Sequence, residues 1–257
     1  EIAQCLVGSE MCIRDSMKTL HLILLSCLML TLCSWGTREK GSGNVIKEQR
    51  EVGHFTALNT SSGIHVFLTQ GQAEPIRIEA EDNIIKYVET EVEKNRLVIA
   101  VNRDRKQKNL EITKPINVYV SIPNLEKIEA SSASQIKVTN AWKATNMEIE
   151  VNSAAQLIMN LDVTHLDLEV SSAAKVQLNG KGDILDAEVS SAANLDAEKF
   201  IVRKADIEVS SNAKATIYVT DELEYDTNSM GKLDYYGEPR ILKAESDYAK
   251  PRGKGVK

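Results

Sequence analysis

The chain has 257 residues and a mildly acidic balance, with 37 Asp and Glu against 31 Lys and Arg and a formal net charge of −6. No block of Lys and Arg is interleaved with aromatic residues, and aromatics make up only 5% of the chain. This composition argues against nucleic-acid partners and against stacked-ring platforms for sugars or bases. The length allows one elongated domain or two small ones.

The amino end predicts export. Residues 1–16 precede the expected initiator Met17 and resemble translated vector or adapter sequence, so we exclude this non-native leader from the fold. Residues 17–36 start with Met and Lys and carry an apolar run from Leu22 to Leu32, shorter than the roughly 18 residues of a membrane-spanning helix. The pattern favours a signal peptide over a transmembrane anchor, and so a location in the periplasm, outer membrane or cell surface.

All four cysteines lie in these two segments. Cys5 and Cys12 belong to the leader, and Cys27 and Cys33 to the signal peptide, so the exported part has no disulfide framework. Cys33 and Cys27 each end a stretch similar to a lipobox and are the lipidation candidates. Two possibilities stay open, a lipid anchor on one of these cysteines or simple cleavage, and the anchor would be the protein's only expected link to a membrane.

Residues 37–123 are predicted to form a β-rich N-terminal part that is less regular than the second half of the chain. Thr60-Ser61-Ser62-Gly63 resembles the corners of the later repeat, and Ser61 lies 70 residues before Ser131. One corner is therefore expected to form before an insertion. The predicted elements of the insertion are strands at 76–80, 96–102 and 116–122 and a short helix at 82–87 that caps the first coil.

Residues 124–238 contain a repeated motif, seen most clearly as Leu168-Glu-Val-Ser-Ser-Ala-Ala174. The first Ser or Asn of each copy falls at positions 131, 152, 171, 190, 210 and 228, in steps of 21, 19, 19, 20 and 18. A period near 20 residues indicates a stack of similar units. Apolar and polar residues alternate on both sides of the small residues, as in strands with one buried face.

The repeat predicts an all-β fold, a single-stranded parallel β-helix with coils of about 20 residues. Each coil is expected to hold two strands that meet at the small-residue corner, and a return path containing Leu161, Val163, Phe200 and Val202 as a third wall. An antiparallel sandwich is the main alternative, but it does not explain why the same corner returns in phase. Residues 239–257, with Pro239 and Pro251, are predicted to end the stack as a tail.

The chain also resembles a known family. The matching segments are Gly41 to Val45, Phe55 to Gly71, Val118 to Leu125 and the serial Ser-Ser-Ala-Ala corners. These are similar to the family called putative auto-transporter adhesin, head GIN domain, over roughly Gly41 to Tyr236. The family's corners usually read Ser-Gly-Gly-Ser-Asp, whereas here Ala replaces most glycines and Lys, Asn or Gln often replaces Asp. The resemblance implies a right-handed β-helix in an exported protein, with adhesion as a name more than an activity.

Two columns of acidic residues are the candidate site. The residue two before each corner position is acidic, and a second acidic position precedes it by two. In-register stacking would place these carboxylates about 4.8 Å apart on an outer wall. A calcium site or a face for a cationic ligand is one hypothesis, and a solvated strand face is the favoured alternative because no Gly-marked ligand loop accompanies the columns. The calcium candidates are Glu150, Glu169, Glu188, Glu208, Asp167, Asp186 and Asp206.

The corner serines, such as Ser172 and Ser191, could hydrogen-bond glycans, but satisfying and packing the corner is the favoured explanation. Catalytic patterns find little support: His54, His65 and His165 are isolated, and no Ser lies in a Gly-x-Ser-x-Gly setting.

The sequence therefore predicts a noncatalytic cell-envelope protein, an adhesin or surface-interaction module without a cofactor other than possible calcium, whose partner is an envelope or extracellular glycan or protein. A carbohydrate-active β-helix enzyme, a polysaccharide lyase or hydrolase, is one alternative, and a structural spacer is another. A cleft where a basic residue and carboxylates converge on one coil would favour the enzyme, and a uniform wall would favour binding or scaffolding.

Overall fold

The computed structural model describes residues 38–102, 109–246 and 252–254. The predicted leader, the signal peptide with Cys27 and Cys33, and Pro251 lie outside the described residues. One 16-stranded sheet winds through the molecule, and a separate small sheet pairs β1 (Arg38–Lys40) with β8 (Asn109–Glu111). Within the described residues, no helix is long and apolar enough to span a membrane.

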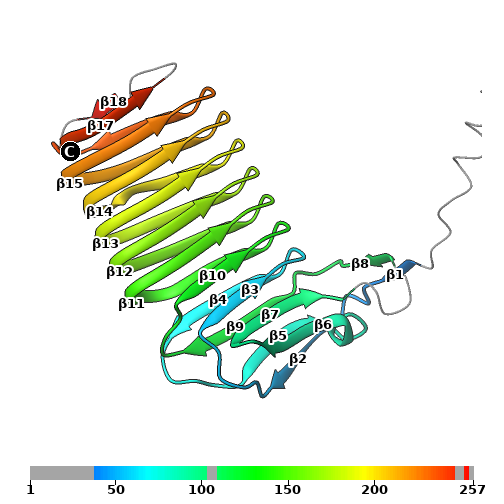
Figure 1. The fold of residues 1–257 in the computed structure, drawn as a ribbon. Coiled ribbons are helices and arrows are strands. Elements are labelled where there is room, and N and C mark those ends of the chain that lie inside the picture. The colour runs from blue at the N-terminus through cyan, green and yellow to red at the C-terminus, as the bar shows by residue number, and fades with distance from the viewer. Residues whose placement is uncertain (1–37, 103–108, 247–251, 255–257) are drawn as a thin grey trace, which may run out of the picture.

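Five long strands form the regular part of the molecule. Each pairs in parallel with the next along the chain, and Figure 1 shows them stacked with their tight loops aligned along one edge. The predicted solenoid is confirmed, and parallel pairing rules out the antiparallel sandwich for this part. These strands are β11 (Gln135–Val151), β12 (Gln156–Val170), β13 (Lys175–Val189), β14 (Asn194–Val209) and β15 (Lys214–Thr227).

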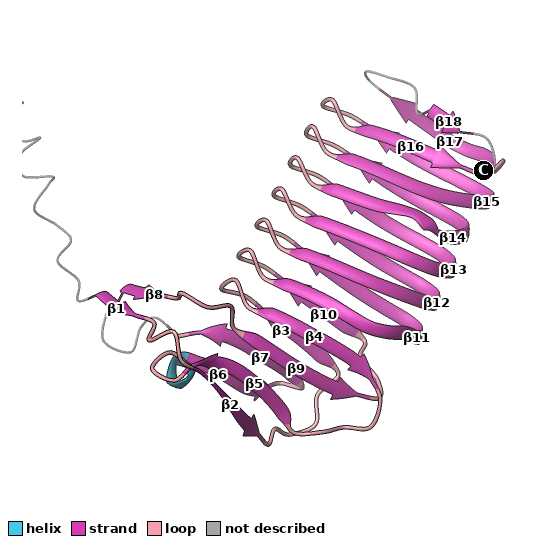
Figure 2. Cartoon of the chain, turned by 180° about the vertical axis from the view of Figure 1, so that it is seen from behind, coloured by secondary structure: helices cyan, strands magenta, loops and turns pink. Residues whose placement is uncertain are grey.

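Each coil has one tight corner and one bend. In β12 every second residue from Leu157 to Val163 is buried, and the alternation resumes at Leu166 after two non-buried residues, Thr164 and His165. The strand turns back at such a place, so both views show a tight loop on one edge and a curved strand on the other (Figures 1 and 2). Leu161, predicted to lie in a separate third wall, instead continues the strand that starts after the corner.

The corners share one backbone conformation. Ser172 and Ala173 both have positive φ, 53° and 62°, and the Ala174 amide donates to the Ser171 carbonyl at 3.1 Å. Two successive left-handed residues closed by such a bond make a turn of the type I′ class, which reverses the chain within two residues. The Ala173 amide then donates to the Ser191 carbonyl of the next corner at 3.0 Å. Successive corners are therefore stacked and hydrogen-bonded in register.

The structure corrects the reason given for small residues at the corner. Ser172 and Ala173 are exposed, and among the described residues the Ser172 hydroxyl makes no hydrogen bond, so neither packing nor local backbone bonding explains them. The fourth residue of each turn is the buried one; Ala155 and Ala174 are both 0% exposed, and Ile64 takes this place in the first corner, so a large apolar residue is also accepted there. The two middle residues instead adopt a left-handed conformation that suits glycine best.

One coil of the stack forms before the insertion, as predicted from Ser61. β3 (Ala57–Thr60) pairs with β10 (Lys127–Ala130), and β4 (His65–Gln70) pairs with the start of β11, at a constant offset of 70 residues. Ser62 and Gly63 have φ of 65° and 70°, the same left-handed pair as in the later corners. The first coil of the chain therefore lies inside the stack and not at its end.

The insertion supplies the outer coil and closes it. β7 pairs in parallel with β3, and β9 with β4, on the side away from β10 and β11. Antiparallel partners then cover this coil, β6 on β7 and β5 on β9, with β2 on β5. The bounds are β2 (Val45–Arg50), β5 (Ile76–Glu81), β6 (Val88–Glu93), β7 (Arg96–Val101) and β9 (Asn117–Ile122). The predicted strands are therefore present.

The predicted capping helix is wrong in extent and role. Only a 3₁₀ turn, η1 (Ile85–Tyr87), forms within the predicted 82–87 segment, and the antiparallel strands close the stack. Buried Ile84 and Ile85 draw this segment into the core, which leaves no room for a longer surface helix.

The stack continues beyond Pro239, where the sequence predicted its end. β16 (Lys232–Tyr236) and β17 (Arg240–Ser246) both pair with β15, and β18 (Arg252–Lys254) pairs with β16. Pro239 lies in the link between β16 and β17, where the chain turns and no ladder hydrogen bond is needed from its nitrogen. Every residue of β17 is exposed.

Candidate functional site

The two predicted acidic columns are stacked in register on one wall, which we call the acidic wall. Glu150 pairs with Glu169, Glu169 with Glu188, and Glu188 with Glu208. The second column runs beside it through the pairs of Asp167 with Asp186 and of Asp186 with Asp206. All seven candidate carboxylates therefore come from the strand segments that lead into the corners, and alternation with buried apolar residues points them outward.

Among the described residues, lysines offset this charge at the two ends of the wall, and His165 contacts Asp186 in between. Lys127 occupies the second column before Glu148, and its ammonium lies 2.7 Å from Glu148, 2.5 Å from Glu150 and 3.2 Å from Glu129. Partial burial alone would lower the pKa of Lys127, but the three carboxylates raise it above its ordinary value. At the other end Lys243 takes the same column position after Glu224.

The middle of the acidic wall carries uncompensated charge. Among the described residues, no ion pair reaches Asp167, Glu169, Glu188 or Asp206. Partial desolvation and the neighbouring carboxylates of Glu150 and Glu188 raise the pKa of Glu169. Like charges about 4.8 Å apart repel by about 1 kcal/mol per pair in water, so the acidic wall costs stability.

The acidic wall does not form a calcium cage. Calcium takes six to eight oxygens at about 2.3–2.6 Å from several directions, whereas a flat strand face offers carboxylates from one side only. The described residues include no group of three or more His, Cys, Asp or Glu able to hold a metal ion. Calcium binding stays a prediction that no such ligand cluster supports. Its candidate residues are Glu150, Glu169, Glu188, Glu208, Asp167, Asp186 and Asp206.

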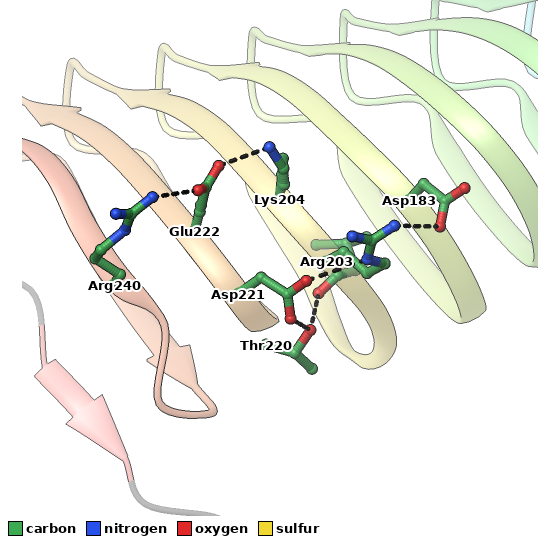
Figure 3. A network of polar contacts seen from close by, with 8 residues as sticks. Asp183, Arg203, Lys204, Thr220, Asp221, Glu222 and Arg240 are labelled. Atoms are coloured by element: carbon green, nitrogen blue, oxygen red, sulfur yellow. Dashed lines mark hydrogen bonds and ion pairs between the residues drawn. The ribbon is translucent and has the colours of Figure 1, made fainter.

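In the C-terminal coils, ion pairs connect side chains of successive coils at the bend beside the acidic wall. Figure 3 shows Glu222 between Lys204 and Arg240, at 2.7 and 2.5 Å, and Arg203 between Asp221 and Asp183, at 3.1 and 3.9 Å. These pairs link successive coils across the bend. They are largely exposed, so each contributes about 0–1 kcal/mol.

The same bend opens into a groove at the first coils of the repeat. Loop residues before β10, the bend of β11 and the facing residues of β12 enclose about 630 Å³. The groove is lined in part by Lys143, Glu126, Glu148, His165 and Asp167. Sequence reasoning named Asp167 and His165 but missed Glu126 and Lys143. The 21-residue step from 131 to 152, the longest of the repeat, was the signal that could have found them.

His165 is not isolated, contrary to the sequence-based expectation. Its Nε2 lies 2.8 Å from an Asp186 oxygen in the next coil. The imidazole therefore ties two coils together at the margin of the groove. His54 and His65 lie in the N-terminal region, and His54 contacts Asn95 at 3.3 Å.

Comparison with known proteins identifies the fold and its family. The model of the family described as "Putative auto-transporter adhesin, head GIN domain" matches residues 54–239. A crystal structure titled as a putative adhesin from Bacteroides fragilis has a TM-score of 0.75 at 19% identity, covering 85% of this chain and 100% of that one. A second putative adhesin, from Parabacteroides merdae, has a TM-score of 0.67 at 20% identity, covering 86% and 98%.

A structure titled as a putative lipid binding protein, from Parabacteroides distasonis, has a TM-score of 0.63 at 17% identity and covers 86% of this chain and 100% of that one. At these identities the likeness shows the fold alone. No curated protein matches the chain.

Proposed function

The chain belongs to the putative auto-transporter adhesin, head GIN domain family, and on that premise we propose that it is a noncatalytic, exported surface-interaction module. The proposal assigns binding to the acidic wall, which displays carboxylates at the same two positions in successive coils from β11 to β15. The in-register repetition carries this proposal, because identical side chains at a fixed spacing suit an extended partner with multiple contacts. A catalytic site would require one coil to differ from its neighbours.

The energetic cost of the acidic wall supports the same assignment. Uncompensated carboxylates at Asp167, Glu169 and Glu188 repel one another and destabilise the fold. A partner that carries cationic groups would relieve this repulsion when it binds. The partner class is an envelope or extracellular glycan or protein.

Two wall variants test the assignment. The first, E169Q/E188Q/E208Q, removes three charges from one column of the acidic wall; the second, K175Q/K214Q/K232Q, removes three from one column of the opposite wall. Binding of the purified protein to glycan and matrix-protein arrays is expected to fall at least tenfold with the first variant and to change less than twofold with the second. The reverse pattern, or no ligand on either array, would overturn the proposal.

The enzyme alternative is favoured by one observation, the groove whose lining includes Lys143 together with Glu126, Glu148 and Asp167. Every ligand found in the arrays is therefore incubated with the protein and analysed for cleavage products. If the parent protein forms cleavage products and D167N does not, the chain is a carbohydrate-active enzyme and the noncatalytic proposal is wrong. Bound ligand recovered intact supports the binding module.

Export is part of the proposal and concerns residues outside the described structure. Mass spectrometry of the mature amino terminus of the native protein distinguishes its forms. A diacylated Cys33 or Cys27 would establish a lipid anchor, and an unmodified terminus after Gly36 would establish simple cleavage. A mature protein that begins at Met17 would contradict export.

A further inference from the structure

The groove exists because one stretch of β11 has no strand neighbour on its N-terminal side. β4 pairs with Gln135–Val138 and β10 pairs with Glu148–Val151, so the bend between these segments is uncovered on that side. The later coils have continuous neighbours through most of the bend. The opening is therefore a local interruption of the repeat, the feature that separates a site from a repeated surface.

At both ends of this uncovered edge, hydrogen bonds satisfy backbone groups of β11. The Gln70 carboxamide accepts from the Lys143 amide at 2.8 Å and donates to the Lys143 carbonyl at 2.9 Å, as a neighbouring strand would. At the other end the Glu148 amide donates to the Glu126 carbonyl at 2.9 Å. The edge between these two anchors borders the groove.

The charges of the groove favour a ligand with a cationic group. Glu148 already forms an ion pair with Lys127 at 2.7 Å. Glu126 accepts from the Thr56 hydroxyl at 3.3 Å, and no cation pairs with Asp167 among the described residues. Two exposed carboxylates are therefore available to a ligand ammonium.

The remaining lining mixes polar and apolar side chains, and its polar groups suit a hydroxyl-rich ligand. Thr145 and Asn146 offer neutral donors and acceptors, and Lys143 lies on the side shared with a second hollow of about 390 Å³ that includes Asp162. Among the described residues, no Phe, Tyr or Trp ring lines either space, so recognition rests on hydrogen bonds and charge. A volume of about 630 Å³ is typical of sites for small ligands of a few linked rings.

We propose that this groove binds a short oligosaccharide bearing a free amine, with the ammonium on Asp167 and Glu126 and the hydroxyls on Thr145 and Asn146. An extended basic peptide fits less well, because β11 bends here and a bent edge cannot continue a regular ladder of hydrogen bonds. The proposal goes beyond the proposed function, because the groove shares only Asp167 and Glu148 with the acidic wall, and it rests on that function for binding without turnover.

Calorimetry at pH 6 and low salt tests this proposal with a β-linked glucosamine trisaccharide as the probe. The N-acetylated trisaccharide is the matched ligand, equal in length but without the charge. The free-amine form is expected to bind at least tenfold more tightly, and added NaCl should weaken it. Equal binding of the two sugars, or tighter binding of trilysine than of the glucosamine trisaccharide, would overturn the inference.

Substitutions of the groove carboxylates test whether the sugar binds in the groove. D167N and E126Q are each expected to weaken the free-amine sugar at least tenfold, while D196N, which removes one carboxylate from the opposite wall, changes the affinity less than twofold. Both groove carboxylates are exposed, and D167N also removes a charge from the acidic wall, so neither variant should lower the melting temperature of the parent. Unchanged affinity in both groove variants would overturn the inference.

The failure of this inference and the failure of the proposed function give different results. A ligand that is lost in E169Q/E188Q/E208Q but kept in D167N and E126Q overturns the groove site and leaves the surface-interaction module standing. Cleavage of the trisaccharide overturns the noncatalytic module.

Discussion

The stacked coils and the N-terminal region are stabilised in different ways. In the stack, each coil repeats the same contacts with its neighbours, so Val151, Val170 and Val189 lie in register in the core and the corners repeat one hydrogen bond. In the N-terminal region, single polar side chains hold particular segments together. Stability is therefore spread over many equal contacts in one region and concentrated in a few in the other.

Glu81 is the clearest example of a single side chain that holds several segments of the N-terminal region together. It is 0% exposed, and its carboxylate accepts from the Thr113 hydroxyl and from the amides of Gly43, Thr113 and Lys114. Burial alone would raise the pKa of this carboxyl, but the hydrogen bonds hold it below its ordinary value. One side chain thus joins the end of β5 to two separate loops.

The largest expected effect comes from Glu81→Ala. The substitution leaves three backbone amides without their acceptor, and we expect a loss of about 4 kcal/mol confined to the N-terminal region. Hydrogen exchange should show faster exchange in β2 and β5 with β12 to β14 still protected. Uniform loss of protection along the whole stack would contradict the contrast between the two regions.

Lys127→Gln should have the next largest effect, because Lys127 lies where the regions join. Its loss leaves Glu129, Glu148 and Glu150 facing one another, and we expect about 2 kcal/mol of destabilisation. Chemical denaturation of this variant at low and high salt measures the effect. The exposed ion-pair variant Lys181→Gln is the control and should change stability by less than about 0.5 kcal/mol.

Ala173→Gly should stabilise the stack by about 1 kcal/mol. Ala173 has φ of 62°, a conformation that glycine adopts at no steric cost and alanine does not. The adjacent Ala174→Gly is the control, since that buried residue has no positive φ and should lose stability. A lower melting temperature for Ala173→Gly would refute the explanation of the corner.

The smallest effect is a difference in pH response. The lowered pKa of Glu81 contributes stability that is present above the ordinary glutamate value of 4.5 and is lost as pH falls through its folded pKa. The raised pKa of Glu169 has the opposite sign: its charged form destabilises the stack at neutral pH, and protonation relieves this as pH falls toward 4.5. On acidification the stack should gain protection before the N-terminal region loses it.

Hydrogen exchange at pH 7, 5 and 3.5, corrected for intrinsic rates, checks this order. In Glu169→Gln the gain of the stack between pH 7 and 5 should shrink, while the loss in β5 below 4.5 should remain. Parallel changes in both regions would show that the two carboxyls do not act locally.

The sequence alone determined the parallel coils, the in-register acidic columns and the corner at Ser61, because a repeat places the same residue type over itself and the spacing then specifies the neighbour. Tertiary structure alone decided how the insertion closes the stack, since β7 and β9 pair with β3 and β4 without any repeated spacing. It also decided the left-handed backbone at Ser172 and Ala173 and the groove at the bend of β11. The closure depends on pairings that no repeat specifies, and the corner backbone takes a conformation that Ser and Ala do not favour. The groove lies where a strand neighbour of β11 is missing, which the longer step from 131 to 152 marks without showing the opening itself.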